Sequence, residues 1–368
     1  MRDQRYEKLA KVLVHYSVGV EKGHLVRIEG APLAEPLITE VYREVLRTGA
    51  HAVVRVHMPA LSEIYFKTAK KHQLEFVNPI VKFETEKFDR VIGVWADDNT
   101  KSLSNVDPKK QALRSASTRK IFKRFLEREA KGDLKWVGTQ FPCNASAQDA
   151  EMSLTEYEDF VLRACLVHLP NPTAAWKAVH AKQERIVRFL NKRKTFRIVT
   201  KDTDLTFKAG GRKWINCDGK ANMPDGEIFT GPIEDTAEGT IAFSFPGFYM
   251  GREAQGVKLT FQKGKVVKAA ASKGESFLKS MLDSDAGARR IGEIAIGTNY
   301  GIDRFTKNTL FDEKIGGTVH MALGASLPES GGVNQSGIHW DIVTDMRKGG
   351  LIYADGRVIY RNGRFVIK

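Results

Sequence analysis

The sequence predicts two parts of different fold class: an α/β part with a largely parallel sheet over residues 1–193, and an α+β part with a largely antiparallel sheet over residues 194–368. Segments with helical and strand-like apolar spacing alternate in the first part. Short strands separated by turn residues dominate the second. Because 368 residues exceed what one hydrophobic core normally serves, we expect two domains that divide near residue 193.

The first part shows the alternation of strand and helix that is typical of parallel sheets. Its first strand runs into Gly30-Ala31-Pro32 and is not followed by a nucleotide-binding glycine fingerprint, so we expect no nucleotide cofactor there. The expected strands are His24–Glu29, His51–His57, Arg90–Trp95 and Leu134–Thr139, and the expected helices include Ala34–Thr48, a long helix after Pro108, Leu154–His168 and Thr173–Leu190.

The second part contains strands and tight turns in close succession. Asp355-Gly356 and Asn362-Gly363 are strong two-residue hairpin turns, because both residues readily adopt positive φ. Antiparallel strands therefore account best for this part. The expected strands include Thr195–Thr200, Leu205–Lys208, Gly239–Phe245, Val257–Phe261 and Val266–Ala271.

Composition excludes several classes of protein. Hydrophobic residues make up 42% and charged residues 28%, as in folded globular chains. We find neither an apolar run of about 18 residues nor a secretory signal in Met1–Lys11, so we expect a cytoplasmic protein with no membrane partner. Cys143, Cys165 and Cys217 are odd in number and lack a CxxC spacing, which argues against a disulfide framework and a zinc-thiolate site.

The formal net charge of +14 raises the question of nucleic-acid binding. The basic residues are spread along the whole chain. Their densest clusters, 119–128 and 182–194, lie in helix-like segments, where a run of charge usually marks the solvated face. We therefore expect no nucleic-acid partner.

Two histidines near the carboxyl end are candidate metal ligands. Ser336–Val343 has the character of a strand, and alternation along a strand places His339 and Asp341 on one face. An imidazole beside a carboxylate suits a divalent cation such as Zn²⁺ or Co²⁺, although a histidine paired with a surface acid gives the same pattern. His320 lies in a strand bounded by glycines and is either a satisfied core histidine or a ligand.

Three glutamates precede these histidines. Glu293 lies inside the apolar run Gly292–Gly297, where a carboxylate is costly to bury unless it is paired or bound to a metal. Glu227 also follows a glycine, but its position fits equally a solvated acid at the end of a strand. Glu313 is either a further ligand or an ion-pair partner of Lys314.

Four motifs occur in one order: MPDGEIFTGP, GEIAIGTN, FDEKIGGTVHMALG and NQSGIHWDIV. Together they resemble the thermophilic-type metalloaminopeptidases, the family that includes aminopeptidase T and aminopeptidase S. The resemblance covers the carboxyl-terminal part by motif and the amino-terminal part by architecture only.

The resemblance implies a metal-dependent aminopeptidase that releases amino acids from the free N-terminus of peptides by means of water activated at a dinuclear site. It implies two divalent ions per chain, drawn from Zn, Co, Mn and Mg, and a homodimer. Glu293 is the candidate bridging ligand and Glu313 the candidate general base. The implied metal ligands are Glu227, Glu293, Glu313, His320, His339 and Asp341.

One position departs from the family pattern, and two other readings stay open. Leu327 stands where family members commonly carry a tyrosine near the metals, and Tyr249 and Tyr300 are candidate replacements. Another dinuclear metallohydrolase, or a catalytically inactive relative that binds peptides or nucleic acid, would also carry these motifs. A covalent mechanism is not expected, because no serine or cysteine lies in a nucleophile motif.

Overall fold

The computed structural model describes residues 3–367, which form two compact units. One unit comprises the chain up to Ala175 together with Gly219–Pro224, and the other comprises Trp176–Asp218 together with the chain from Asp225 onward. The second unit therefore begins before residue 193, and the expected domains 1–193 and 194–368 stay a prediction. Within the described part of the chain, no helix is both long enough and apolar enough to cross a bilayer.

The first unit contains a five-stranded sheet in which every neighbouring pair is parallel, as the alternation predicted. The last strand comes from a segment that we expected in the antiparallel part. It has only two residues, too few to show any periodicity. The strand order is β2 (His51–Val56), β1 (Leu25–Gly30), β3 (Arg90–Trp95), β4 (Lys135–Gln140) and β8 (Asn222–Met223).

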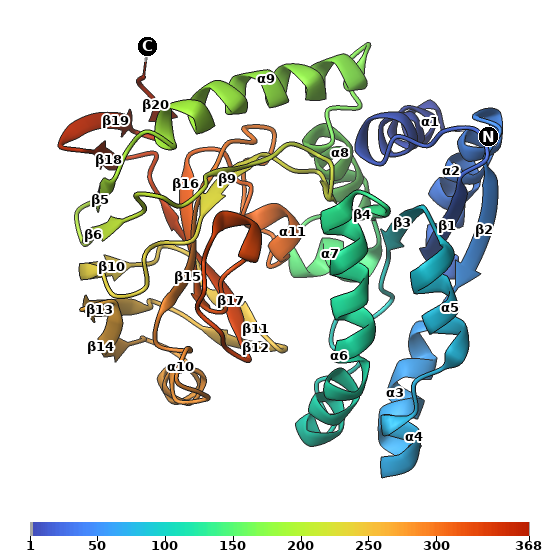
Figure 1. Ribbon diagram of the computed structural model, residues 1–368, viewed down its shortest axis with the longest axis horizontal. Helices are drawn as coiled ribbons and strands as arrows, with labels where there is room; N and C mark the ends of the chain where they lie inside the picture. Colours follow the sequence, from blue (N-terminus) through green and yellow to red (C-terminus); the bar gives the residue numbers. More distant parts are fainter. Residues whose placement is uncertain (1–2, 368) are drawn as a thin grey trace. The chain divides into compact units, whose positions relative to one another are not determined.

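Figure 1 labels the helices of this unit, and local sequence signals account for the ends of two of them. Ser153 caps α8 in a reciprocal capping box with Glu156. Gly132 ends α6 in the left-handed region that glycine favours. The α-helices are α1 (Gln4–Lys11), α2 (Glu35–Arg47), α3 (Pro59–Thr68), α4 (Lys71–Glu75), α5 (Pro79–Lys87), α6 (Pro108–Lys131), α7 (Asn144–Asp149) and α8 (Leu154–Ala164), and α1 continues as a π-helix over Val12–Ser17.

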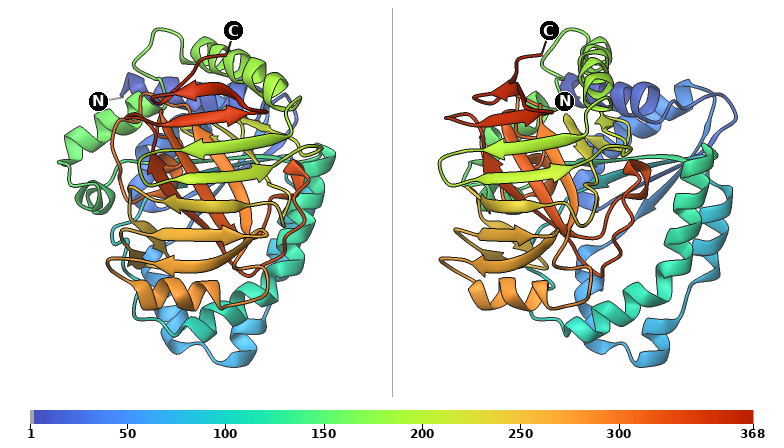
Figure 2. Two further views of the ribbon diagram at one scale, coloured as in Figure 1. Left: turned by 90° about the vertical axis from the view of Figure 1, so that its left-hand side faces the viewer. Right: turned by 60° about the vertical axis from the view of Figure 1, so that its left-hand side comes forward.

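The second unit contains an eight-stranded antiparallel sheet, seen face-on in the left view of Figure 2. Both predicted hairpin turns occur in it: Asp355-Gly356 joins β18 to β19, and Asn362-Gly363 joins β19 to β20. The strand order is β14 (Lys265–Ala270), β13 (Lys258–Gln262), β10 (Glu238–Ala242), β6 (Asp204–Lys208), β5 (Thr195–Val199), β18 (Leu351–Ala354), β19 (Arg357–Arg361) and β20 (Arg364–Phe365).

A five-stranded antiparallel sheet carries the motif residues. Its order is β17 (His339–Asp345), β16 (Thr318–Gly324), β15 (Ile291–Gly297), β9 (Glu227–Thr230) and β7 (Ile215–Cys217). The antiparallel prediction is confirmed, but β17 begins at His339, not at Ser336. The side chain of Asp285 accepts hydrogen bonds from the Ser336 hydroxyl and the Gly337 backbone N–H, which holds this segment outside the ladder.

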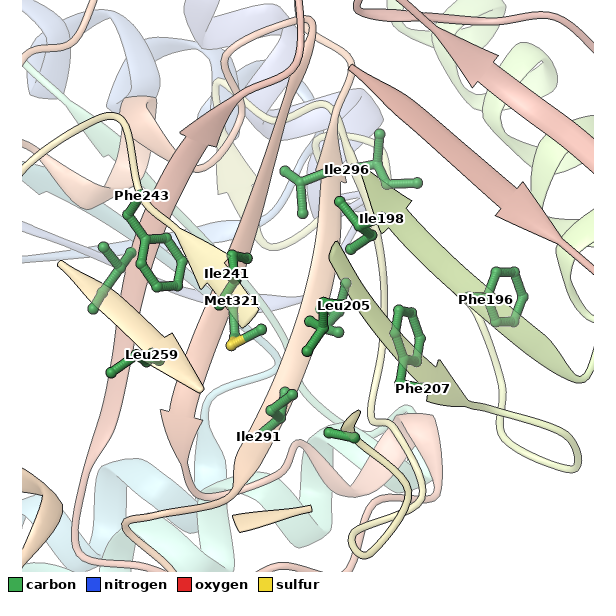
Figure 3. Close-up of a cluster of buried hydrophobic side chains, with 14 of the residues drawn as sticks. Phe196, Ile198, Leu205, Phe207, Ile241, Phe243, Leu259, Ile291, Ile296 and Met321 are labelled. Atoms are coloured by element: carbon green, nitrogen blue, oxygen red, sulfur yellow. The ribbon is translucent and has the colours of Figure 1, made fainter. Parts of the chain in front are cut away.

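The two antiparallel sheets share one hydrophobic core (Figure 3). Phe196, Phe207 and Ile241 of the larger sheet belong to the same buried cluster as Ile296 and Met321 of the smaller. Each such side chain contributes about 1.5–3 kcal/mol when it leaves water. Because successive strand residues face opposite sides, one face of the smaller sheet is committed to this core and the other is available for a site.

The remaining elements of the second unit connect the strands. α9 (Pro172–Leu190) leads into the unit, and α10 (Glu275–Leu282) and α11 (Thr309–Asp312) precede β15 and β16 respectively. A two-stranded ribbon of β11 (Gly247–Tyr249) and β12 (Arg252–Ala254) completes it.

Candidate metal centre

Alternation along the strands of the smaller sheet separates core residues from candidate ligands. The core face carries Ile228, Ile294, Ile296, Val319, Met321, Leu323, Trp340 and Ile342. The intervening positions belong to the opposite face. That face carries Glu227 of β9, Glu293 of β15, His320 of β16, and His339 and Asp341 of β17. The predicted common face of His339 and Asp341 is confirmed.

A β-bulge sets the direction of Glu293. Ile291 pairs with Leu323 and Glu293 with Ala322, so two steps on β15 match one step on β16. Both Ile291 and Ile294 therefore reach the core, and Glu293 faces away from it. Gly292 permits the bulge, because a Cβ there would lie 2.1 Å from the Ala325 carbonyl oxygen.

A second glycine precedes Glu227 for a related reason. Gly226 has φ +117°, which side-chain-bearing residues rarely adopt, and a Cβ on it would lie 2.8 Å from Asn299 Cβ. The glycine before each acid, visible in the sequence, thus reflects a backbone that must turn or pass closely beside another segment.

The structure brings all six predicted ligands together in two groups. In each group one ligand atom per residue lies within 4.8 Å of the others. The first group is Glu227, Glu313 and His320, and the second is Glu293, His339 and Asp341. The second group is on β15 and β17, whereas Glu313 comes from the C-cap of α11.

Glu293 lies between the two imidazoles and links the groups. Its Oε1 is 3.5 Å from His320 Nε2, and its Oε2 is 3.4 Å from His339 Nε2. His339 Nε2 is also 3.5 Å from Asp341 Oδ2, and His320 Nε2 is 3.4 Å from Glu227 Oε2. The Glu293 carboxylate therefore lies beside both groups, and the bridging role implied for it stays a prediction.

Glu313 also forms the ion pair that the sequence offered as an alternative. Lys314 Nζ donates to Glu313 Oε2 at 2.6 Å and lies 3.3 Å from Glu227 Oε1. The lysine side chain is only 2% exposed. Its burial was not foreseen, because a lysine beside an acid is usually solvated.

The pKa values of the clustered side chains are shifted because their carboxylates are buried away from water. Burial raises the pKa of Glu227 and raises that of Asp341 to about 8. Burial opposes ionisation of Glu293 too, but the two imidazoles outweigh it and lower the pKa of Glu293 to about 2. Burial would lower the pKa of both histidines, yet the surrounding carboxylates raise it to about 9 for His320 and about 10 for His339. The cluster therefore favours a bound positive charge.

Several buried polar atoms fit bound cations. Within residues 3–367, no hydrogen-bond partner reaches Glu227 Oε2, Asp341 Oδ1 or either ring nitrogen of His320. Buried polar atoms without partners are costly, and coordination would satisfy them. The donor set of imidazole nitrogens and carboxylate oxygens suits Zn²⁺, Co²⁺ and Mn²⁺.

Hydrogen bonds behind the ligands fix their orientation. The His339 Nδ1 lies 2.8 Å from the Ala325 carbonyl oxygen, so Nδ1–H donates and Nε2 faces the cluster. Gln183 of α9 donates to the backbone carbonyl of Glu227 at 3.0 Å and accepts from the Thr298 hydroxyl at 2.7 Å. Thr298 directly follows β15, so Gln183 ties two ligand-bearing strands together. Helical spacing alone did not distinguish Gln183 from its polar neighbours.

Tyr249 and Tyr300 are the candidate replacements for the tyrosine that family members commonly carry near the metals. The Tyr300 hydroxyl donates to the Gly363 carbonyl at 2.7 Å. The Tyr249 ring packs beside Trp340, with centroids 6.0 Å apart. Leu327 lies at the N-cap of the short 3₁₀ helix Pro328–Ser330. Tyr300 and Tyr249 are thus each engaged in a contact outside the six ligands.

A small hollow lies beside the cluster. Phe248 and Phe305 form part of its apolar wall, Lys307 also lines it, and Glu313 and Asp341 line it beside the cluster. The Phe305 ring stacks on the Phe245 ring, with centroids 4.9 Å apart. Two of the six candidate ligands therefore line this hollow.

Residues 2–365 match the family model described as thermophilic metalloprotease (M29). The chain belongs to this family of metalloaminopeptidases. It is 28% identical to aminopeptidase PepS of Streptococcus thermophilus, over 99% of this chain and 98% of that protein. It is 27% identical to aminopeptidase T of Thermus thermophilus, over 98% of each chain.

The fold agrees with that of a solved relative. The structure of wild-type AmpT from Thermus thermophilus superposes with a TM-score of 0.86, covers 99% of both chains and is 24% identical in sequence. An α/β amino-terminal part and an antiparallel carboxyl-terminal part, as the sequence predicted, are thus the architecture of this M29 protein.

Proposed function

We propose that this M29 protein releases amino acids from the free N-terminus of peptides by means of two divalent cations held at the paired ligand groups. The observation that carries the proposal is Glu293, whose two oxygens face the imidazoles of both groups. The family membership and the likeness to aminopeptidases PepS and T support it.

The cations, when bound, would supply Lewis acidity and lower the pKa of water at the site. Glu227, Glu313 and His320 would hold one, and His339 and Asp341 the other, with Glu293 shared between them. The Nδ1–H···O bond to Ala325 orients the His339 imidazole for this role.

The chain's own side chains then account for proton transfer and specificity. Glu313, at the edge of the hollow, would accept a proton from the attacking water and deliver it to the leaving amine. The carboxylates at the cluster would attract the protonated α-amine of a substrate, which restricts cleavage to the first residue. Phe248 and Phe305 would contact the side chain of that residue.

Hydrolysis of aminoacyl anilides tests the proposal. We expect leucyl p-nitroanilide to be cleaved, activity to disappear on treatment with a chelator, and activity to return with Co²⁺, Zn²⁺ or Mn²⁺. An N-acetylated substrate is the matched control, because it lacks the free amine, and it should be resistant. Absence of cleavage with every metal would contradict the proposal. Steeply salt-dependent binding of nucleic acid would then favour an inactive binding relative.

We also propose that the protein is a homodimer. Apolar side chains are exposed on edge strand β2 and the following helices, as Val54 (40%), Val56 (55%), Ile64 (57%) and Phe83 (61%) show. Exposed apolar surface of this kind is typical of interfaces. Light scattering on the purified chain should give twice the monomer mass of 41.2 kDa. A concentration-independent monomer would contradict the proposal.

A further inference from the structure

A buried lysine distinguishes the two ligand groups. Lys314 Nζ lies 2.6 Å from Glu313 Oε2 and 3.3 Å from Glu227 Oε1, and both carboxylates belong to the first group. In the second group, the ion pairs that Glu293 and Asp341 form within residues 3–367 are with imidazoles only. One group therefore has an ammonium as a built-in neighbour, and the other does not.

The position of Lys314 is fixed by its backbone. Its N–H donates to the Phe311 carbonyl, and its own carbonyl accepts from the Asn299 N–H, both at 3.0 Å. Ile315, the next residue, forms a parallel bridge with Asn299. Since the side chain is 2% exposed, the ammonium has no short path to solvent and remains beside the two carboxylates.

The ammonium affects a cation in two ways. It engages one oxygen of each carboxylate, Glu313 Oε2 and Glu227 Oε1, so a metal in the first group would share both carboxylates with the ammonium. It also repels a divalent ion, and this repulsion is strong because the site is buried. An imidazole that binds a metal is neutral, so the first group then has two carboxylates offset by one ammonium, whereas the second has two carboxylates and no such offset.

We infer that Lys314 makes the two metal groups unequal, so that Glu293, His339 and Asp341 take the first divalent cation tightly and Glu227, Glu313 and His320 take the second weakly. The inference rests on the proposed metal centre and adds an order of filling to it. The weaker group contains Glu313, the candidate base. Glu313 would therefore have a cation beside it only at higher metal concentration.

Titration calorimetry with Co²⁺ on the chelator-treated full chain tests the inference without an activity measurement. We expect two classes of site that differ in affinity by at least about tenfold. Lys314→Met should tighten the weaker class and bring the two affinities together. Lys314→Arg, the matched control, keeps the charge and should keep the difference. Circular dichroism should show that both variants are folded.

Two further variants do not depend on replacement of the lysine. Asp341→Asn should remove the tight class and leave weak binding, whereas Glu313→Gln should leave tight binding intact. Two equal sites in the wild-type chain, or an unchanged difference in Lys314→Met, would overturn the inference alone. A chain that binds no Co²⁺ in any form would overturn the proposed metal centre and the inference together.

Discussion

Ala322 of β16 lies directly opposite Asp341 of β17 in the antiparallel ladder. On its other side it pairs with Glu293 of β15. The short alanine side chain thus stands in one row between two candidate ligands, where it is fully buried. The small size of this residue leaves space over the sheet where the two carboxylates face His339.

We expect Ala322→Val to weaken metal binding by at least about tenfold, because two added methyl groups fill the space between the carboxylates. Overpacking should cost about 1–3 kcal/mol of stability. Calorimetry with Co²⁺ and a thermal melt measure the two effects. Ala322→Ser adds a single oxygen and serves as the control. Full metal affinity in the valine variant would show that the space beside Ala322 is not part of the metal centre.

Glu293→Gln tests the residue that links the two groups. The amide has the size of the carboxylate but lacks its charge, so it cannot serve two cations. We expect kcat/KM to fall by at least about 10²-fold, since even residues behind a metal ligand have effects of this size. Metal content by elemental analysis should fall with it, while the circular dichroism spectrum should not change.

A control variant shows whether the effect of Glu293→Gln comes from loss of a metal ligand or from loss of any negative charge. Glu329 is exposed in the 3₁₀ helix Pro328–Ser330, and Glu329→Gln should keep wild-type activity and metal content. Equal losses in both glutamine variants would contradict a specific role for Glu293.

Local pattern sufficed for most of the fold, whereas the full set of candidate ligands came from the resemblance that the four ordered motifs carry. Alternation placed His339 and Asp341 on one face, and the cost of burying an acid singled out Glu293. Local pattern could not predict contacts that depend on the tertiary fold. β8 joins the parallel sheet through two residues, and Lys314 is buried only because Glu227 and Glu313 converge on it.

Gln183 is another residue whose role depends on tertiary contacts, and Gln183→Met tests it. The side chain is 1% exposed and donates to the backbone carbonyls of both Cys217 and Glu227. A thioether of similar size makes neither bond. We expect a loss of about 1–3 kcal/mol of stability, because buried carbonyls lose their donor. Metal affinity should fall by about 10- to 100-fold as Glu227 loses support.

Calorimetry and denaturant unfolding of Gln183→Met measure these effects. Gln262→Met is the matched control, because Gln262 is exposed on β13 of the larger sheet. A stable Gln183→Met protein with unchanged metal affinity would show that α9 does not position β9.

Asp285 provides a pH-dependent contribution to stability outside the metal cluster. Burial would raise its pKa, but hydrogen bonds from the Gly337 and Gly287 backbone N–H groups and the Ser336 hydroxyl lower it below the usual value. A lowered folded-state pKa stabilises the protein above the unfolded-state pKa of about 3.9. This contribution is lost as the pH falls through the folded-state value.

We therefore expect Asp285→Asn to lower the free energy of unfolding at pH 7 by about 1–2 kcal/mol, a modest figure because the side chain is half-exposed. The difference from wild type should shrink below about pH 4, where the wild-type carboxylate also becomes protonated. Urea unfolding at several pH values measures it. Asp283→Asn, which removes an exposed partner of Arg289, is the control and should have little effect at any pH. A difference that stayed constant down to pH 3 would mean that Asp285 acts through its shape, and that its charge does not hold the segment that leads into His339.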